Sequence, residues 1–304
     1  KELLRQKTAA AQPVADALVP DPQARHQPFP PTPIQEAYLL GRRPGFAVSG
    51  VGCHAYSECE IGELDPDRLE ATWNALVARH DMLRAVADAD GVRVLPAVPT
   101  YRFVRLDLRG CSPEASEAAL AAIHREMAST LRDPAAWPLF DLRLTRLADD
   151  RWRLHMDLEL MTVDASANLR LLSEWGRLYT GEPLPALPAL QFRDYRLATL
   201  ADGPATRPAR AYWEPRLATL PGPPDLPLIS DPASAATTPT RRTLQLPAAA
   251  WTRFKAEAQA RGVTPNAALA TAFSAALATY AASDAHTLTV TLFDRRPLHP
   301  DVGE

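Results

Sequence analysis

The sequence has 304 residues, of which 46% are hydrophobic and 23% charged, and its formal net charge is −3 at pH 7. This composition is typical of a globular protein with enough apolar material for two cores, and the lack of a basic block disfavours nucleic acid as a partner. The three cysteines, Cys53, Cys59 and Cys111, form no CxxC pair, and the chain opens on KELLRQK without an apolar stretch behind it. We therefore expect free thiols, no secretory leader and a cytoplasmic protein.

Residues 1–26 are polar and Ala-rich without a strong pattern, so we interpret them as a linker. After them, amphipathic helices are mixed with short alternating strands. Strands are predicted at 54–62, 91–98, 101–108, 139–148 and 151–160, and the last two form a hairpin around Asp149-Asp150. Helices are predicted after Pro33 and at 64–84, 112–130 and 165–179.

The helix at 64–84 has the clearest pattern in the first half of the chain. Asp65 is placed to cap its first turn, and Pro66 suits the first helical position. Its apolar stripe, which predicts a buried face, consists of Leu69, Trp73, Leu76 and Val77.

The junction at 151–179 joins a strand of unbroken alternation, RWRLHMDLEL, to a helix through the segment MTVDAS. On the polar face of the strand we expect His155 and Asp157 to lie in solvent, while Glu159 is either a solvated carboxylate or part of a site. Asp164 stands where a helix N-cap would stand. One helical stripe carries Leu169, Leu172, Gly176 and Tyr179, with Leu171, Trp175 and Leu178 beside it.

The second half begins after the Pro-rich tract 183–190, which we interpret as a joint between two lobes. Helices are predicted at 190–200, 209–220 and 249–261, the last ended by Gly262, and strands at 241–247 and 286–296. The stretch 263–283 has no charge, but its spacing of Leu269, Phe273 and Tyr280 predicts a buried helix, capped by Thr264, rather than a membrane span.

This order of elements predicts an α+β fold with a linker at 1–26, an N-terminal lobe at 27–184 and the first part of a C-terminal lobe at 185–304. The second lobe has fewer elements than the first, so its sheet looks incomplete. We expect the natural protein to continue beyond Glu304.

Five stretches in register carry a resemblance to a family. They are FPPTPIQEAYLLGR, RHDMLRA, the strand–loop–helix at 151–179, AYWEPRLATLPGPPDLPL and TVTLFDRRPLHP. Together they resemble the heterocyclization domains of nonribosomal peptide synthetases, a branch of the condensation-domain superfamily, from about His26 to the end of the chain. The resemblance implies two chloramphenicol-acetyltransferase-like lobes that form a pseudo-dimer around a tunnel.

The resemblance also implies the activity. Such a domain joins an acyl or peptidyl donor to Cys, Ser or Thr by an amide bond, and then closes the side chain onto that amide with loss of water to give a thiazoline or oxazoline. Both substrates arrive on the phosphopantetheine arms of upstream and downstream carrier domains, beside an adenylation domain. We therefore expect no cofactor bound by the chain itself, no metal and no membrane. The identity of the acyl donor, and the choice among the three acceptors, cannot be read from the sequence.

The family marks this junction with Asp-x4-Asp-x2-Ser, and aligning on the helix that ends in Leu178-Tyr179 puts the second Asp at Asp164. The first Asp then falls on Glu159 and the Ser on Ala167, so one of the three residues is unchanged. An alternative that uses Asp157 and Ser166 has the wrong spacing to Asp164. We take Glu159 and Asp164 as candidate catalytic residues and Ala167 as tunnel support.

Other family positions fall outside this junction. Thr289 occupies a position usually held by Asn and is the third catalytic candidate. Arg79 is expected to hold the first lobe together, and Asp294 and Arg295 are expected to form a pair that braces the second lobe. The family's Thr and Asp of the cyclodehydration step would lie beyond Glu304.

Two alternatives to the full reaction stay open. The changes at Glu159, Ala167 and Thr289 favour a domain that condenses without closing the ring. A third hypothesis is a non-catalytic scaffold that docks carrier or adenylation domains.

Overall fold

The computed structural model describes residues 18–43, 50–200, 206–227, 243–290, 295–296, 298–299 and 302. The chain divides into two compact units, residues 1–201 with 295–304 and residues 202–294. The lobe boundary expected at residue 184 stays a prediction.

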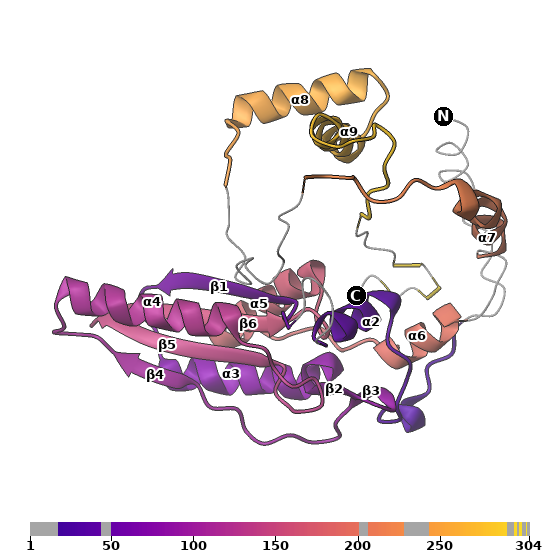
Figure 1. Ribbon diagram of the computed structural model, residues 1–304. Helices are drawn as coiled ribbons and strands as arrows, with labels where there is room; N and C mark the ends of the chain where they lie inside the picture. Colours follow the sequence, from indigo (N-terminus) through magenta and orange to yellow (C-terminus); the bar gives the residue numbers. More distant parts are fainter. Residues whose placement is uncertain are drawn as a thin grey trace. The chain divides into compact units, whose positions relative to one another are not determined.

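The first unit is built on a four-stranded sheet of order β1-β6-β5-β4 (Figure 1). β1 and β5 pair with β6 in antiparallel fashion, and β4 runs parallel to β5. The predicted hairpin is therefore confirmed.

The strands are β1 (His54–Ile61), β2 (Ala85–Asp88), β3 (Gly91–Val94), β4 (Val104–Asp107), β5 (Phe140–Ala148) and β6 (Arg151–Glu159), of which β2 and β3 form a separate two-stranded sheet. The helices are η1 (Pro22–Ala24), α2 (Pro33–Gly41), α3 (Pro66–Arg79), η2 (Asp81–Arg84), α4 (Pro113–Ser129), α5 (Ala165–Thr180) and α6 (Phe192–Leu200).

Helix α3 forms as its sequence predicts. The side chain of Asp65 accepts hydrogen bonds from the backbone N–H groups of Asp67 and Arg68, and Pro66 stands in the first turn. The stripe of Leu69, Trp73, Leu76 and Val77 is buried against the sheet.

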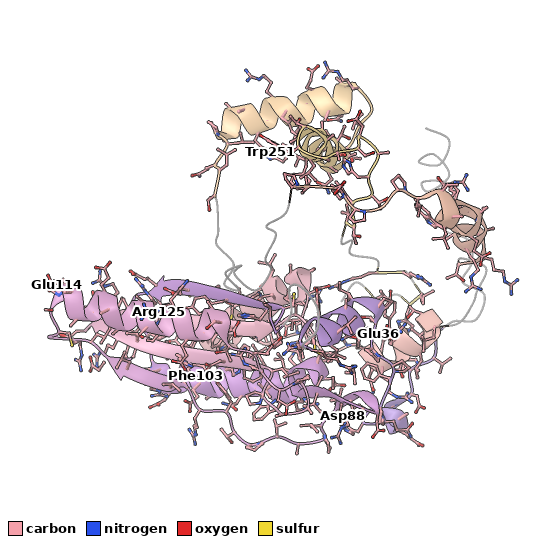
Figure 2. The ribbon with its side chains drawn as sticks, viewed as in Figure 1. Glu36, Asp88, Phe103, Glu114, Arg125 and Trp251 are labelled. Carbon is pink, nitrogen blue, oxygen red and sulfur yellow. The ribbon has the colours of Figure 1, made fainter. Side chains whose placement is uncertain are left out.

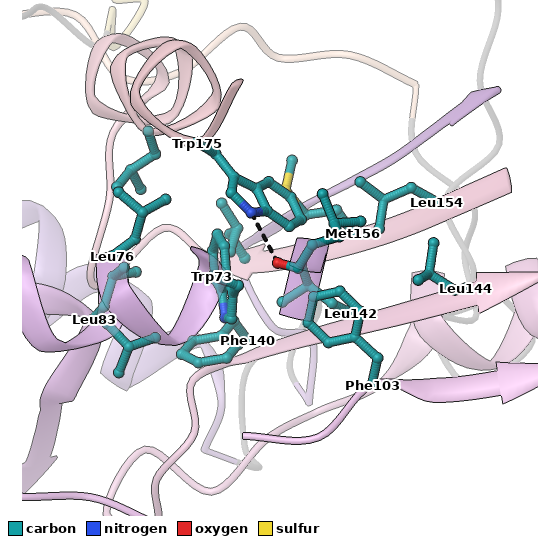
Figure 3. Packing of buried hydrophobic residues seen from close by; sticks show 14 of the residues in the cluster. Trp73, Leu76, Leu83, Phe103, Phe140, Leu142, Leu144, Leu154, Met156 and Trp175 are labelled. Atoms are coloured by element: carbon teal, nitrogen blue, oxygen red, sulfur yellow. Dashed lines mark hydrogen bonds between the residues drawn. The ribbon is translucent and has the colours of Figure 1, made fainter. Parts of the chain in front are cut away.

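The main core lies between the sheet and helices α3 and α5. The ring centroid of Trp73 is 5.2 Å from that of Phe140 and 4.9 Å from that of Trp175. Trp175 Nε1 donates to the Leu69 carbonyl at 3.2 Å, so the indole is buried with its polar atom satisfied (Figure 3). This network joins α5 to α3 and fixes the helix that follows the junction.

The buried side of α5 differs from the predicted stripe. Leu171 and Trp175 are buried, whereas Leu169 is 70% and Leu172 40% exposed. The helical pattern placed two adjacent stripes correctly, but the contact with α3 selects the one that contains Trp175.

The polar face of β6 is also buried from His155 onward, so the expectation that His155 and Asp157 lie in solvent is wrong. Both side chains have no exposed surface. Helix α4 lies over this face of the sheet (Figure 1), where Glu126 of α4 pairs with Arg143 of β5. The middle of the sheet is therefore covered on both sides, and charged side chains on its polar side pair with one another.

The second unit contains α7 (Arg207–Trp213), η3 (Glu214–Thr219), α8 (Ala248–Ala260) and α9 (Pro265–Ala278). Thr264 caps α9 as predicted, accepting from the Ala267 N–H at 3.2 Å. The predicted burial of α9 is wrong, since Leu269 is 44% and Phe273 60% exposed. In the described part of this unit α8 packs against α9. No residue of α9 is buried, and side chains project outward from both helices (Figure 2).

The two strands predicted in the second half are not found where the structure describes them. Residues 243–247 and 286–290 form no strand, and 241–242 and 291–294 lie outside the described residues. Within the described chain, no helix combines the length and the apolar character needed to cross a bilayer.

Candidate functional site

The junction after β6 is a tight turn followed by a capped helix. The backbone N–H and the hydroxyl of Thr162 each donate to the Glu159 carbonyl at 3.0 Å. Asp164 then adopts an extended conformation, and its Oδ1 accepts from the Ala167 N–H at 2.7 Å. The predicted N-cap is confirmed, and the cap fixes the direction of α5 relative to the end of β6.

Asp164 has a second partner, because Arg295 Nη2 donates to its two carboxylate oxygens at 3.0 and 2.9 Å. Partial burial raises the pKa of Asp164, but the Ala167 N–H and the Arg295 guanidinium outweigh this and hold the pKa below its ordinary value. The side chain is therefore an ionised anchor. The expected partner of Arg295, Asp294, lies outside the described residues.

Glu159 is fully buried, so the interpretation as a solvated strand carboxylate is wrong. Arg42, which directly follows α2, donates from Nη2 to Glu159 Oε2 and from Nη1 to the Arg132 carbonyl, the latter at 2.7 Å. Glu159 Oε1 is buried and has no hydrogen-bond partner. Burial raises the pKa of Glu159, and the charges of Arg42 and Arg132 offset only part of that effect.

A second buried carboxylate lies beside the first. Asp157 accepts from His54 Nδ1 and from Arg132 Nη1, both at 2.5 Å, and Arg132 Nη1 is also 4.0 Å from Glu159 Oε1. His54 is the register partner of Glu159, so the two side chains share the α4-facing side of the sheet. The hydrogen bond to Asp157 raises the pKa of His54 despite its burial.

Sequence reasoning missed three residues of this site: Arg42, His54 and Arg132. Alternation predicts that Asp157 and Glu159 share one face of β6, and the register of β1 against β6 adds His54 to that face. The two arginines come from loops after α2 and α4, and no periodic signal connects those loops to the end of β6.

The other predicted residues take supporting or separate places. Ala167 donates its N–H to Asp164, and its methyl packs against the main core. Arg79 donates to Glu174 of α5 at 3.1 Å and to the Pro185 carbonyl at 2.7 Å, so it ties α3 to α5 as the structural role requires. Thr289 is exposed and lies in the second unit, and its catalytic role stays a prediction.

Metal and thiol chemistry can be assessed from side-chain positions. Among the described residues, no group of three or more His, Cys, Asp and Glu side chains is arranged to hold a metal ion. The three cysteines are free thiols. Cys53 is half-buried close to Glu159, and burial raises the pKa of its thiol, which keeps it neutral near pH 7.

Comparison with known proteins places this geometry in a family. Residues 51–303 match the family model described as Condensation domain. The chain is 37% identical over 98% of its length to phenyloxazoline synthase MbtB of Mycolicibacterium paratuberculosis, of which it covers 26%. It is 35% identical over 93% of its length to pyochelin synthetase PchF of Pseudomonas aeruginosa, of which it covers 16%.

Solved structures agree with the sequence matches. The EpoB NRPS cyclization-docking bidomain of Sorangium cellulosum superposes with a TM-score of 0.85 at 35% identity, covering 99% of this chain and 61% of that one. The nonribosomal peptide synthetase FmoA3 gives 0.79 at 33% identity, covering 97% of this chain and 29% of that one. The predicted α+β fold of chloramphenicol-acetyltransferase-like type is therefore confirmed. The chain belongs to the condensation-domain family, on the branch of the nonribosomal peptide synthetase heterocyclization domains.

Proposed function

We propose that this chain is most of a heterocyclization domain within a longer synthetase, and that it catalyses amide condensation followed by cyclodehydration. The observation that carries the proposal is the buried carboxylate of Glu159, which has a raised pKa, an unpartnered oxygen and a place at the junction where the family has its acidic motif. The similarity to a phenyloxazoline synthase over 98% of the chain supports the same reaction.

The first step is acyl transfer between two carrier-bound groups. The amine of the acceptor Cys, Ser or Thr attacks the donor thioester carbonyl, the C–N bond forms, the C–S bond breaks, and the leaving thiolate takes up the proton lost by the amine. Holding the two arms in attack geometry supplies most of the acceleration, and a buried acceptor oxygen can orient the amine.

The second step removes water from the new amide. The acceptor's thiol or hydroxyl adds to the amide carbonyl carbon, and its proton is transferred to the carbonyl oxygen. The resulting hydroxyl leaves as water after a further protonation, and loss of the N–H proton completes the C=N bond. A carboxyl group whose pKa is raised by burial can give the proton to the leaving hydroxyl and take one back from nitrogen.

Within this scheme the residues have different tasks. Glu159 is the proton-transferring group, held by Arg42. Asp164 is a positioning residue, because its ionised carboxylate is already occupied by the Ala167 N–H and Arg295. Thr289 is proposed as a hydrogen-bond donor from the second lobe.

The proposed partners are upstream and downstream carrier domains with an adjacent adenylation domain. The phosphopantetheine arms enter as parts of the substrates, so the chain itself holds no cofactor. MbtB and PchF are several times longer than this chain, which supports the proposal of a multidomain setting.

The test uses the natural full-length synthetase. Its donor carrier is loaded with an acyl group, its acceptor carrier with Cys, Ser or Thr in turn, and the acceptor-bound product is weighed by mass spectrometry. A product one water lighter than the linear amide establishes ring closure. If the product is the linear amide alone, cyclodehydration is overturned and condensation is kept. If no acyl group is transferred although both carriers are loaded, the enzyme hypothesis is wrong and the non-catalytic scaffold hypothesis remains.

Two variants at and beside Glu159 test whether this residue transfers the protons of ring formation. Glu159→Gln keeps the shape and the hydrogen bond from Arg42 but removes the transferable proton, so we expect a loss of about 100-fold or more in ring formation. Gly52→Ala is a second probe, because the added methyl would lie at an ordinary 3.6 Å from Glu159 Oε1 and would cover it without a clash. Asp150→Asn, an exposed carboxylate in the β5–β6 turn, is the matched control.

Condensation without ring closure is the second candidate, and Ala167 is the observation that favours it. Its methyl packs on the core where the family motif has a hydroxyl. If this loss limits the second step, Ala167→Ser should raise the ratio of cyclised to linear product, since the added hydroxyl stands beside the Asp164 cap.

A further inference from the structure

Glu159 and four neighbouring side chains form one buried charge cluster, which comprises Arg42, His54, Arg132, Asp157 and Glu159. Arg42 binds Glu159, Arg132 and His54 bind Asp157, and Arg132 lies 4.0 Å from Glu159 Oε1. The exposed fraction of these side chains is 10% or less. In such a site water screens the charges little, so a change on one group acts on the others.

The charge of the cluster depends on His54. When both carboxyl groups are ionised and the imidazole is neutral, two guanidinium groups balance two carboxylates. Protonation of the imidazole then gives the cluster one extra positive charge. His54 Nδ1 is held by Asp157, so a proton arrives or leaves at the other ring nitrogen while the ring stays in place. His54 can therefore gain or lose a proton without a change of hydrogen-bond partners.

The imidazole and the Glu159 carboxylate are close neighbours. A Cβ placed on Gly52 would lie 3.6 Å both from His54 Cδ2 and from Glu159 Oε1. Glu159 Oε1 is the buried oxygen without a hydrogen-bond partner, so the charge on His54 acts on the atom of Glu159 that no donor occupies.

From this geometry we propose that His54 is a positioning residue that sets the pH at which Glu159 takes up a proton. Protonation of His54 favours the ionised form of Glu159, and loss of that proton makes the carboxyl group a weaker acid. The inference rests on the proposed function insofar as Glu159 transfers protons, and it adds a second residue and a pH control to that role.

The other charged and titratable groups around His54 favour either the ionised carboxylates or the protonated imidazole. Arg42 after α2 and Arg132 after α4 favour the carboxylates, and Asp157 and Glu159 of β6 favour the imidazolium. Cys53, which precedes β1, is hydrogen-bonded with Tyr38 of α2, and burial keeps both neutral near pH 7. Within the charge cluster, His54 and Glu159 are thus the two groups whose pKa is raised.

The test measures proton binding directly. Nuclear magnetic resonance follows the side-chain carboxyl carbon of labelled glutamate and the ring of labelled histidine between pH 4 and 9 in the present chain. Glu159→Gln and His54→Asn identify the two signals by their loss. Asn at position 54 can still donate to Asp157, so the hydrogen bond is kept while the titrating charge is removed.

The expected result is a reciprocal pair of shifts. His54→Asn should raise the pKa of Glu159, and Glu159→Gln should lower the pKa of His54, each by about tenfold in the dissociation constant or more. Because the coupling between two sites is a single free energy, the two shifts should agree in size. The matched control His124→Asn, an exposed histidine paired with Glu58, should move Glu159 less than about twofold.

Failure of this inference is distinguishable from failure of the proposed function. If the carboxyl signal of Glu159 keeps its midpoint in both His54→Asn and His54→Gln, the inference is wrong, whatever the synthetase produces. If the midpoints shift and the full-length His54→Asn synthetase shows a matching displacement of its pH–rate profile for ring formation, both hold. Coupled midpoints with no cyclised product in any variant would overturn the proposed reaction alone.

Discussion

The ion pair between Arg42 and Glu159 gives the sharpest prediction of stability. The exposed fraction of the side chain is 7% for Arg42 and zero for Glu159. Arg42→Met keeps most of the apolar stem but leaves a buried carboxylate without its main counter-charge, and breaking a buried pair in this way costs about 3–5 kcal/mol. Glu159→Gln keeps an acceptor for Arg42 and should cost less, about 1–3 kcal/mol. The double variant should cost less than the sum of the two single variants.

The assay is urea unfolding followed by tryptophan fluorescence, because Trp73 and Trp175 report on the core beside the junction. The pH dependence separates charge from packing. Without Arg42 the pKa of Glu159 should rise further, so the folded state binds more protons than the unfolded chain, and stability should fall as pH rises from about 4.3 towards the folded pKa. A deficit of Arg42→Met that is equal at pH 5 and pH 8, with additive single variants, would refute the account of a charge pair.

Three further predictions concern the same unit. Asp164→Ala removes the N-cap of α5 and should cost about 1 kcal/mol, seen as a fall of about 2–4 °C in the melting temperature, whereas Asp164→Asn retains the cap and should cost less. Leu142 is fully buried in the core, so Leu142→Ala should lower the free energy of unfolding by about 2–5 kcal/mol in urea. A loss below about 1 kcal/mol would show that the neighbouring side chains fill the cavity. The pKa of His54 is raised, so the stability it contributes is complete below about pH 6.5 and is lost as pH rises through the folded value. The pKa of His155 is lowered by burial, so its contribution is present above about pH 6.5 and lost on acidification, and the deficits of His54→Asn and His155→Asn should therefore change with pH in opposite directions.

Much of the first unit can be predicted from sequence because its signals are local. The cap and stripe of α3 need only Asp65, Pro66 and four apolar residues at helical spacing, and the hairpin needs only alternation around a turn. The N-cap at Asp164 is of the same kind, since an acceptor side chain before a helix binds the N–H groups of the next turn wherever the helix packs.

The errors share one physical cause. Alternation along β6 shows which side chains share a face, but whether that face meets water depends on α4, which is 22 residues earlier in the chain. His155 and Asp157 were expected in solvent for this reason, and α4 with Arg132 encloses them. Likewise, the pattern of α9 shows an apolar helix but not the neighbours that would cover Leu269 and Phe273.

The two carboxylates of the junction illustrate what structure adds to sequence. In the sequence Glu159 and Asp164 are two acidic residues five positions apart. The helix pattern makes Asp164 an N-cap, but no pattern shows which of the two carboxyl groups can hold a proton. In the structure burial raises the pKa of Glu159, whereas partial burial of Asp164 is outweighed by the Ala167 N–H and Arg295, which lower its pKa. Environments that move two neighbouring pKa values apart separate a group that can hold a proton from one that stays charged. We infer that proton transfer belongs to Glu159 and that Asp164 fixes the helix and Arg295 beside it. The side chain of Asp is one methylene shorter than that of Glu. Glu159→Asp should therefore weaken the ion pair with Arg42, even though it restores the residue found in the family motif.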